Sequence, residues 1–245
     1  MATFSICIAG YTATVESLFD STRDYCRKYL SDDAPDFYIT VTREDLLFEQ
    51  QALDAEADAE GLRRRVFTDP FLERAAIQRQ MAEQLLPRGV LLFHGSAVAA
   101  DGKGYIFSAP CGTGKSTHAR LWLQLLGDRA RYINDDKPFI RLEEGAVSVC
   151  GAPWSGKHGL ENNVCVPLQG ICILRRGTQN TIAPAEPQAV MDFLAHQCLL
   201  PRQEADMACF NRLVQQLAGT VPLFDLSCTP TLEAAQVAFD AMAGR

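Results

Sequence analysis

The sequence predicts an α/β protein, and three observations support this fold class. Apolar segments of strand length alternate with amphipathic segments of helical spacing along most of the 245 residues. Near the middle of the chain, a strand-like apolar segment leads directly into a glycine-rich loop and then into an amphipathic helix-like segment. Apolar residues make up 47% of the chain, which is enough to fill a core and too many for a disordered protein.

The first part of the chain predicts a small α+β region. Gly10 marks a turn, the alternation of Phe37, Ile39 and Val41 is typical of a half-buried strand, and Asp69 is a helix cap. The expected elements are a strand or hairpin over 3–15, a helix over 16–30, a strand over 36–42, and helices over 42–60 and 69–86. We expect a boundary near residue 87, which divides the chain into an N-terminal region, 1–87, and a core, 88–245.

The core predicts a further alternation of strands and helices. Asp101-Gly102 is typical of a tight hairpin turn, and Gly127 is a candidate C-cap. Strands are expected over 89–94, 97–100, 105–108, 131–134, 139–142, 146–150, 168–174 and 222–226, and helices over 115–126, 186–199, 203–218 and 231–243.

The glycine-rich loop matches the phosphate-binding pattern G-x-x-x-x-G-K-[ST] at every fixed position except the first, where Ala109 replaces glycine. Glycines let backbone N–H groups approach phosphate oxygens, and the start of the next helix adds further N–H groups. The expected nucleotide-binding residues are Pro110, Cys111, Gly112, Thr113, Gly114, Lys115, Ser116 and Thr117. Because Pro110 favours an extended residue before it, Ala109 fits the end of the preceding strand.

Charge and composition exclude several functions. The formal net charge is −7, and no basic run is long enough for a nucleic-acid partner, so Arg63-Arg64-Arg65 and Arg175-Arg176 are interpreted as solvated faces. No segment has the apolar length of a membrane helix or the pattern of a signal peptide, so we expect no membrane partner and a cytoplasmic location. The nine cysteines contain no C-x-x-C pair and are expected to be reduced, without a zinc site.

An acidic pair follows the loop. Asp135 comes 135 − 115 = 20 residues after Lys115, an interval that one helix and one strand fill. Asp135 and Asp136 are therefore expected at the end of a neighbouring strand, where phosphoryl transfer needs a carboxylate for Mg²⁺ and a base. A turn or a helix cap is the alternative role for these aspartates.

Two other segments contain side chains that are candidates for binding or catalysis. His94 ends a predicted strand and is either structural or a metal ligand or proton carrier. The loop over 151–158 contains Trp154, which is able to stack on a ring, and Lys157, which is able to contact a phosphate; the alternative is an exposed surface loop. Cys111 is either a redox-sensitive residue or a small filler in the glycine-rich loop.

The order of these segments resembles the core shared by HPr kinase/phosphorylase and ATP-dependent PEP carboxykinase. The resemblance covers roughly 89–175, and its most specific part is the short spacing between the loop and Asp135-Asp136. It implies a strongly curved mixed β-sheet with packed helices. It also implies that Lys115 holds the β/γ-phosphates, that Ser116, Asp135, Asp136 and His94 are the metal-site residues, and that His94, Asp135, Asp136 and Lys157 are catalytic.

The resulting hypothesis is an ATP- and Mg²⁺-dependent kinase that acts on an unidentified hydroxyl of a small molecule, peptide or protein. Two alternatives stay open: a nucleotide-binding regulator without transfer chemistry, and a carboxykinase-like lyase. The chain lacks the large substrate domain of PEP carboxykinases and the Arg/Gly-rich loop that HPr kinases use for their protein substrate, so the acceptor does not follow from the resemblance.

Overall fold

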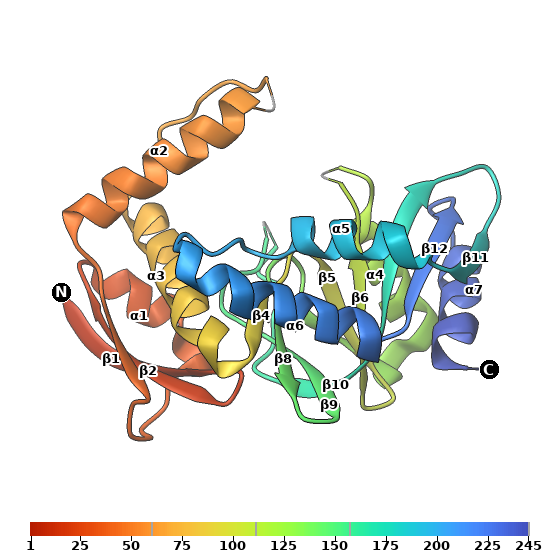
Figure 1. The fold of residues 1–245 in the computed structure, drawn as a ribbon, viewed down its shortest axis with the longest axis horizontal. Coiled ribbons are helices and arrows are strands. Elements are labelled where there is room, and N and C mark those ends of the chain that lie inside the picture. Colours follow the sequence, from red (N-terminus) through yellow and green to blue (C-terminus); the bar gives the residue numbers. More distant parts are fainter. Residues whose placement is uncertain (60, 111, 157, 245) are drawn as a thin grey trace. The chain divides into compact units, whose positions relative to one another are not determined.

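The computed structural model describes residues 1–59, 61–110, 112–156 and 158–244, and the chain forms two compact units, Met1–Leu85 and Leu86–Arg245 (Figure 1). Whether they fold as separate domains, as the predicted boundary near residue 87 implies, stays a prediction. Within the described part of the chain, no helix is both long and apolar enough to cross a bilayer.

The N-terminal unit contains a three-stranded sheet of order β1-β2-β3. Strands β1 (Ala2–Ile8) and β2 (Tyr11–Ser17) form an antiparallel hairpin, and β3 (Phe37–Thr40) pairs parallel to β2. Ala9 and Gly10 both have positive φ, as a two-residue hairpin turn requires. The helices are α1 (Asp20–Tyr25), η1 (Arg27–Tyr29), α2 (Arg43–Ala59) and α3 (Asp69–Leu85).

The predicted helix over 16–30 is wrong at its start and in its continuity. Ser17 belongs to β2, where it is buried and its Oγ donates a hydrogen bond to the carbonyl of Ala2 at 3.1 Å. Cross-strand pairing therefore overrides local helix periodicity at this point. The short α1 that follows is held by Glu73 of α3, a fully buried carboxylate that accepts hydrogen bonds from the N–H of Phe19 at 3.3 Å and from the hydroxyl of Thr22.

The C-terminal unit is built on one curled, mixed sheet of nine strands. Its path is β4-β8-β9-β10-β6-β5-β7, and β12 pairs with both β10 and β11. The strands are β4 (Val90–Leu92), β5 (Ser96–Ala100), β6 (Lys103–Ser108), β7 (Ala130–Asn134), β8 (Phe139–Glu143), β9 (Ala146–Cys150), β10 (Cys165–Arg176), β11 (Thr181–Pro184) and β12 (Leu223–Cys228). The predictions of an α/β fold and a curved mixed sheet with packed helices are confirmed; β11 is a strand that the sequence did not indicate.

Strand β10 is what curls the sheet. Its first residues, 165–167, pair antiparallel with β9, whereas 168–173 pair parallel with β6 and 171–176 pair parallel with β12. The register with β6 shifts between Leu168 and Gly170, which marks a β-bulge. One long strand thus joins the β4-β8-β9 segment to the strands that carry the glycine-rich loop.

Helices cover both faces of this sheet. They are α4 (Lys115–Leu126), α5 (Pro187–Gln197), α6 (Met207–Thr220) and α7 (Leu232–Ala243), with 3₁₀ turns η2 (Leu86–Arg88), η3 (Gly127–Arg129) and η4 (Glu204–Asp206). Alternation along β6 separates two cores, because Ile106 packs in the cluster with α5 and α6 while Tyr105 and Phe107 pack in the cluster with α4 and α7. Figure 1 shows α5 and α6 running beside each other.

The strand ends determine which residues meet at one edge of the sheet. Strands β6, β10 and β12 are mutually parallel, and β5 is antiparallel to both β6 and β7. The C-terminal ends of β7, β6 and β10 therefore lie at the same edge as the start of β5. Across that edge the order is β7, β5, β6, β10, β12, which brings together residues that are far apart in the sequence.

One disulfide joins two of these strands. Cys150 ends β9 and Cys165 begins β10, the two are direct partners in the antiparallel ladder, and their Cα atoms are 4.1 Å apart. The expectation that all cysteines are reduced is therefore wrong for this pair, which sequence spacing did not indicate because register sets the contact. Elsewhere in the described chain the free cysteines are 7, 26, 172, 198, 209 and 228.

Candidate functional site

The glycine loop, residues 109–114, connects the end of β6 to the start of α4. Gly112 and Gly114 have φ values of 73° and 123°, a region that favours glycine. Gly114 is the N-cap of α4, and its carbonyl accepts the N–H of His118 at 2.9 Å. No side-chain cap bond is made at Gly114 by the described residues, so the first turn of α4 presents N–H groups suited to an anion.

Lys115 lies back across the loop. Its Nζ donates a hydrogen bond to the carbonyl of Ala109 at 2.8 Å, and Ala109 is fully buried at the end of β6. Its positive charge also acts on His94 and Asp136, lowering the pKa of both groups. Among the other predicted loop residues, Cys111 lies outside the described residues, while Ser116 and Thr117 belong to the first turn of α4.

The acidic pair is shaped by Asn134, the last residue of β7. The side chain of Asn134 is fully buried, and its Oδ1 accepts the N–H groups of Asp136 at 2.8 Å and Lys137 at 2.7 Å. Its Nδ2 donates to the carbonyls of Ala152 at 2.8 Å and Trp154 at 3.0 Å. One amide thus fixes the turn after β7 and the loop after β9 against each other.

The two aspartates differ in environment. Asp135 is buried, and its Oδ1 accepts the hydroxyl of Ser96 at 2.6 Å. Asp136 has a side chain that is 37% exposed, and its carbonyl accepts the N–H of Gly95 at 3.0 Å. Burial raises the pKa of Asp136, as does the charge of Asp135, whereas Lys137 and Lys115 act in the opposite direction. Asp136 is therefore the more accessible member of the pair.

His94 completes this side of the site. Its Nε2 lies 3.6 Å from Oδ1 of Asp136. Burial, followed by the charges of Lys137 and Lys115, lowers the pKa of His94 to about 3. The imidazole is therefore neutral near pH 7, and its contact with Asp136 is polar rather than an ion pair. Gly95 cannot carry a side chain, because a Cβ would lie 2.8 Å from Cγ2 of Ile106.

The loop after β9 approaches the acidic pair. A Cβ added to Gly156 would lie 3.5 Å from the carbonyl oxygen of Asp135 and 3.7 Å from the Cβ of Asp136. The predicted catalytic residue Lys157 lies outside the described residues. Trp154, a candidate for stacking on a ring, is only 6% exposed and contacts Phe139 edge to face at 6.4 Å between ring centroids, so it anchors the loop in the core.

The described residues do not include a group of three or more His, Cys, Asp or Glu side chains arranged to hold a metal ion. Mg²⁺ does not require such a group, because it keeps several waters and is held by one or two carboxylates together with substrate phosphates. The exposed carboxylate of Asp136, with Asp135 beside it and Ser116 at the start of α4, fits that kind of site.

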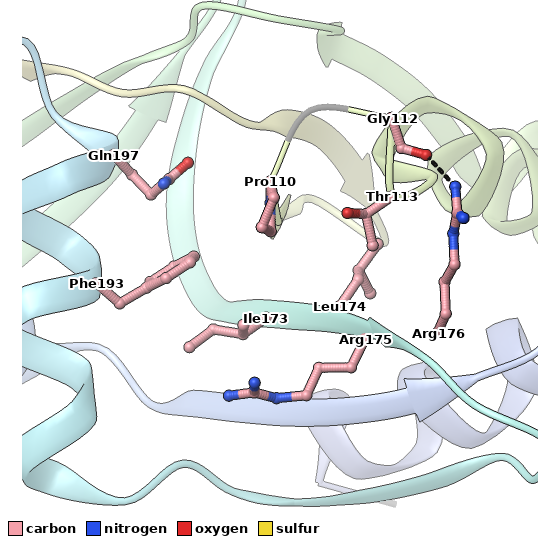
Figure 2. A pocket seen from close by; sticks show the side chains of 9 residues that line it. All are labelled: Pro110, Gly112, Thr113, Ile173, Leu174, Arg175, Arg176, Phe193 and Gln197. Carbon is pink, nitrogen blue, oxygen red and sulfur yellow. Dashed lines mark hydrogen bonds between the residues drawn. The ribbon is translucent and has the colours of Figure 1, made fainter. Parts of the chain in front are cut away.

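A pocket of about 490 Å³ lies on the other side of the glycine loop (Figure 2). Its walls are the loop residues Pro110, Gly112 and Thr113, the end of β10 at 173–176, and Phe193 and Gln197 of α5. It lies in the C-terminal unit and adjoins β10 rather than β7.

Polar contacts fix the pocket walls. Arg176 donates to the carbonyl of Gly112 at 2.5 Å, the dashed line in Figure 2. Arg175 donates through Nε to both carboxylate oxygens of Asp225 at 2.8 Å. Gln197 accepts the hydroxyl of Ser108 through Oε1 at 2.9 Å, and its backbone carbonyl accepts the N–H of His94 at 2.7 Å. The two arginines are exposed, as the solvated-face interpretation states, but they also line this pocket.

The sequence analysis did not select Arg176, Phe193 or Gln197. A signal for Arg176 was available, since it directly follows a predicted buried strand whose carboxyl end reaches the sheet edge where ligands bind in α/β folds. Phe193 and Gln197 reach the site only through the packing of α5, which no local pattern indicates.

Comparisons with known proteins give a weak structural similarity. No protein-family model matches the chain, and no curated protein matches it. Among solved structures, the chain is similar to the Hpr(Ser) kinase/phosphatase from Coxiella burnetii, with a TM-score of 0.36 and 10% sequence identity, over 62% of this chain and 91% of that chain. A TM-score of this size does not establish a common fold.

We expect replacement of Asn134 by alanine to lower the free energy of unfolding by on the order of 3–5 kcal/mol, because four backbone groups lose their partner. Asn162→Ala is the matched control, since its Nδ2 donates a single hydrogen bond, to the carbonyl of Tyr132, and should cost about 1 kcal/mol. Urea unfolding measures both; equal losses would show that Asn134 has no special role.

We expect the His94 imidazole of the metal-free protein to stay neutral between about pH 5 and pH 8. Its NMR resonance, assigned with His94→Gln, should not titrate in this range. Because the folded pKa lies below the unfolded one, the unfolded state binds more protons between about pH 3 and the ordinary histidine pKa of 6.5. Acidification through this window should therefore destabilise the wild type more than His94→Gln. A midpoint near 6.5 for His94 would contradict the geometry.

Proposed function

We propose that this chain is an ATP- and Mg²⁺-dependent phosphotransferase with a P-loop core of the HPr kinase type. It would transfer the γ-phosphoryl group to a hydroxyl of a small molecule, peptide or protein. One observation carries the proposal: Lys115 starts α4 at the sheet edge where His94 and Asp136, from two other segments, lie 3.6 Å apart. A cation at a helix start beside a carboxylate and a neutral imidazole is what phosphoryl transfer requires.

The phosphates would bind along the glycine loop and the first turn of α4. Backbone N–H groups there would face an anion, and Gly112 and Gly114, both at positive φ, carry no side chain that would block it. Lys115 would exchange the carbonyl of Ala109 for the β- and γ-phosphate oxygens, which is a stronger, charge-assisted contact. The chain's net charge of −7 makes this local positive charge necessary.

Ser116 and Asp135 are the residues that would hold Mg²⁺, which would supply neutralisation of the β- and γ-phosphate charge, and Asp136 would be left to accept a proton. His94, neutral and 3.6 Å from Asp136, is the remaining candidate ligand or assisting group. Lys157 is proposed to contact the transferred phosphoryl group or an acidic substrate.

Asp136 is the proposed base. Its raised pKa makes it a better proton acceptor than an ordinary carboxylate, and its partial exposure gives an acceptor hydroxyl access. In the transfer step, the hydroxyl oxygen forms a bond to the γ-phosphorus while its proton passes to Asp136. The bond from the γ-phosphorus to the bridging oxygen breaks, and its electron pair leaves with ADP.

A regulator that binds nucleotide without transfer is the second candidate. The observation in its favour is the buried Ser96–Asp135 hydrogen bond, which gives Asp135 a structural partner and leaves fewer oxygens for a metal. A carboxykinase-like lyase has no observation of its own in its favour.

Lys115→Ala is expected to weaken Mg·ATP binding by about 100-fold or more, because the charge-assisted contacts to the β- and γ-phosphates disappear. Lys103→Ala is the control, since Lys103 is exposed at the opposite end of β6. Isothermal titration calorimetry gives the affinities, and thermal unfolding checks the fold. Unchanged affinity of Lys115→Ala would remove the nucleotide-binding proposal.

Asp136→Asn is expected to keep Mg·ATP affinity within a few-fold and to lower ADP formation by about 100-fold or more, because the proton acceptor is lost. ADP formation is measured with water as the acceptor. If the wild type binds Mg·ATP but forms no ADP under these conditions, the regulator is the better assignment. If the variant turns over at the wild-type rate, Asp136 is not the base.

A further inference from the structure

We infer that the pocket formed by the glycine loop, the end of β10 and α5 binds the nucleoside part of the nucleotide, with the base lying against Phe193. This inference rests on the proposed function and deepens it, because it assigns the end of the nucleotide that the phosphate-binding loop does not contact.

Strand order indicates which end of the nucleotide, the γ-phosphate or the nucleoside, lies on which side of the glycine loop. Across the edge of the sheet, β7 and β5 carry Asp136 and His94 on one side of the glycine loop, and β10 lies on the other side. Asp135 and Ser116 would hold Mg²⁺, which would neutralise the charge of the β- and γ-phosphates, so the γ-phosphate is expected near the carboxylates. The nucleoside, at the opposite end of the phosphate chain, is then directed toward β10, where the pocket lies beside Gly112 and Thr113.

The lining has the chemistry of a site for a planar base. Ile173 and Leu174 provide an apolar floor at the end of β10, and the half-buried ring of Phe193 faces the loop from α5 (Figure 2). Stacking on an aromatic ring accepts any nucleobase, since every base has a π-face. The pocket volume of about 490 Å³ falls within the range of small-molecule sites.

Polar groups are available for the edges of the base and for the sugar. The hydroxyl of Ser108 lies 2.9 Å from the Oε1 of Gln197 and 2.9 Å from the carbonyl of His94, and the two acceptors share its one hydrogen. The amide nitrogen is the other hydrogen-bonding group of the Gln197 side chain. This group is a donor and suits an acceptor nitrogen or carbonyl on a base. The hydroxyl of Thr113 lies on the facing wall, beside the loop backbone.

The two arginines that line the pocket differ in whether their charge is neutralised by a carboxylate. Arg175 is neutralised by Asp225, whereas Arg176 is bonded to a neutral carbonyl, that of Gly112. The positive charge of Arg176 therefore lies where the pocket meets the glycine loop, and there it favours the phosphate nearest to the sugar. A neutral, aromatic inner wall and a cationic rim match a nucleoside that carries phosphate at one end.

The alternative occupant is the hydroxyl-bearing acceptor. Gln197 accepts the N–H of His94 through its backbone carbonyl, so the pocket is linked to the catalytic side of the loop. Strand order favours the nucleoside, because an acceptor must reach Asp136 and His94, which lie across the loop from β10.

The test compares ATP with inorganic tripolyphosphate, both with Mg²⁺, by isothermal titration calorimetry on the full chain. Phe193→Ala should weaken ATP binding by about 10-fold, by loss of stacking on the base, and should leave tripolyphosphate affinity within about two-fold. Asp192→Ala, on an exposed neighbour in α5, should change neither. Retained tripolyphosphate binding also shows that Phe193→Ala is folded.

The outcomes separate the two proposals. If the wild type binds ATP and tripolyphosphate equally and Lys115→Ala abolishes both, the proposed function stands and the nucleoside inference fails. The same inference fails if Phe193→Ala leaves ATP affinity unchanged, which would favour the acceptor as occupant. If the wild type binds neither ligand, the proposed function itself fails.

A second measurement uses only the wild type. Photolabelling with 8-azido-ATP should modify the tryptic peptide of residues 177–202, which contains Phe193 and Gln197. Excess ATP should protect this peptide, and tripolyphosphate should protect it less well at equal concentration. Labelling confined to other peptides would overturn the inference even if Phe193→Ala did not fold.

Discussion

The side-chain amide of Asn134 is the contact on which the geometry of the site depends. It bonds two N–H groups after β7 and two carbonyls after β9, so the acidic turn and the adjoining loop cannot move independently. The same turn is tied to β5 through the bond from Gly95 to the carbonyl of Asp136. Full burial of the amide makes each of these bonds costly to break, because an unpaired polar group would remain in the core.

Around this contact, the positive and negative side chains of the site are arranged in a way that suits a polyanion. The acidic pair lies on the β7 side, where the charges of Lys137 and Lys115 act on Asp136, and Arg176 lies at the β10 side. Burial, followed by the charges of the two lysines, keeps His94 neutral, and the same lysines act against the effect of burial on the pKa of Asp136. A protein with net charge −7 thereby keeps a local region in which negative phosphate groups are tolerated.

Local patterns predicted much of the fold. The turn at Asp101-Gly102 and the C-cap at Gly127 both adopt positive φ, as their residue types indicate. The parts that the sequence did not predict depend on distant pairing: Ser17 is drawn into β2 by Ala2, and Cys150 meets Cys165 through strand register. The loop motif and its spacing to Asp135-Asp136 selected residues that lie at one sheet edge, whereas the pocket residues of α5 are positioned by helix packing alone. The roles of all these residues stay predictions.

The bulge in β10 interrupts the alternation of side chains between the two faces of the sheet. The residues before the bulge and those after it therefore follow separate alternation patterns. Between Leu168 and Gly170 an extra residue interrupts the two-residue repeat, so the half that meets β9 need not share its facing pattern with the half that floors the pocket. Substitutions near Cys165 can therefore alter the fit to β9 without reversing which side chains around Ile173 face the glycine loop. Because of the bulge, one continuous strand pairs with β9 at its start and lines the pocket at its end. The residue types at one end are not dictated by the alternation required at the other.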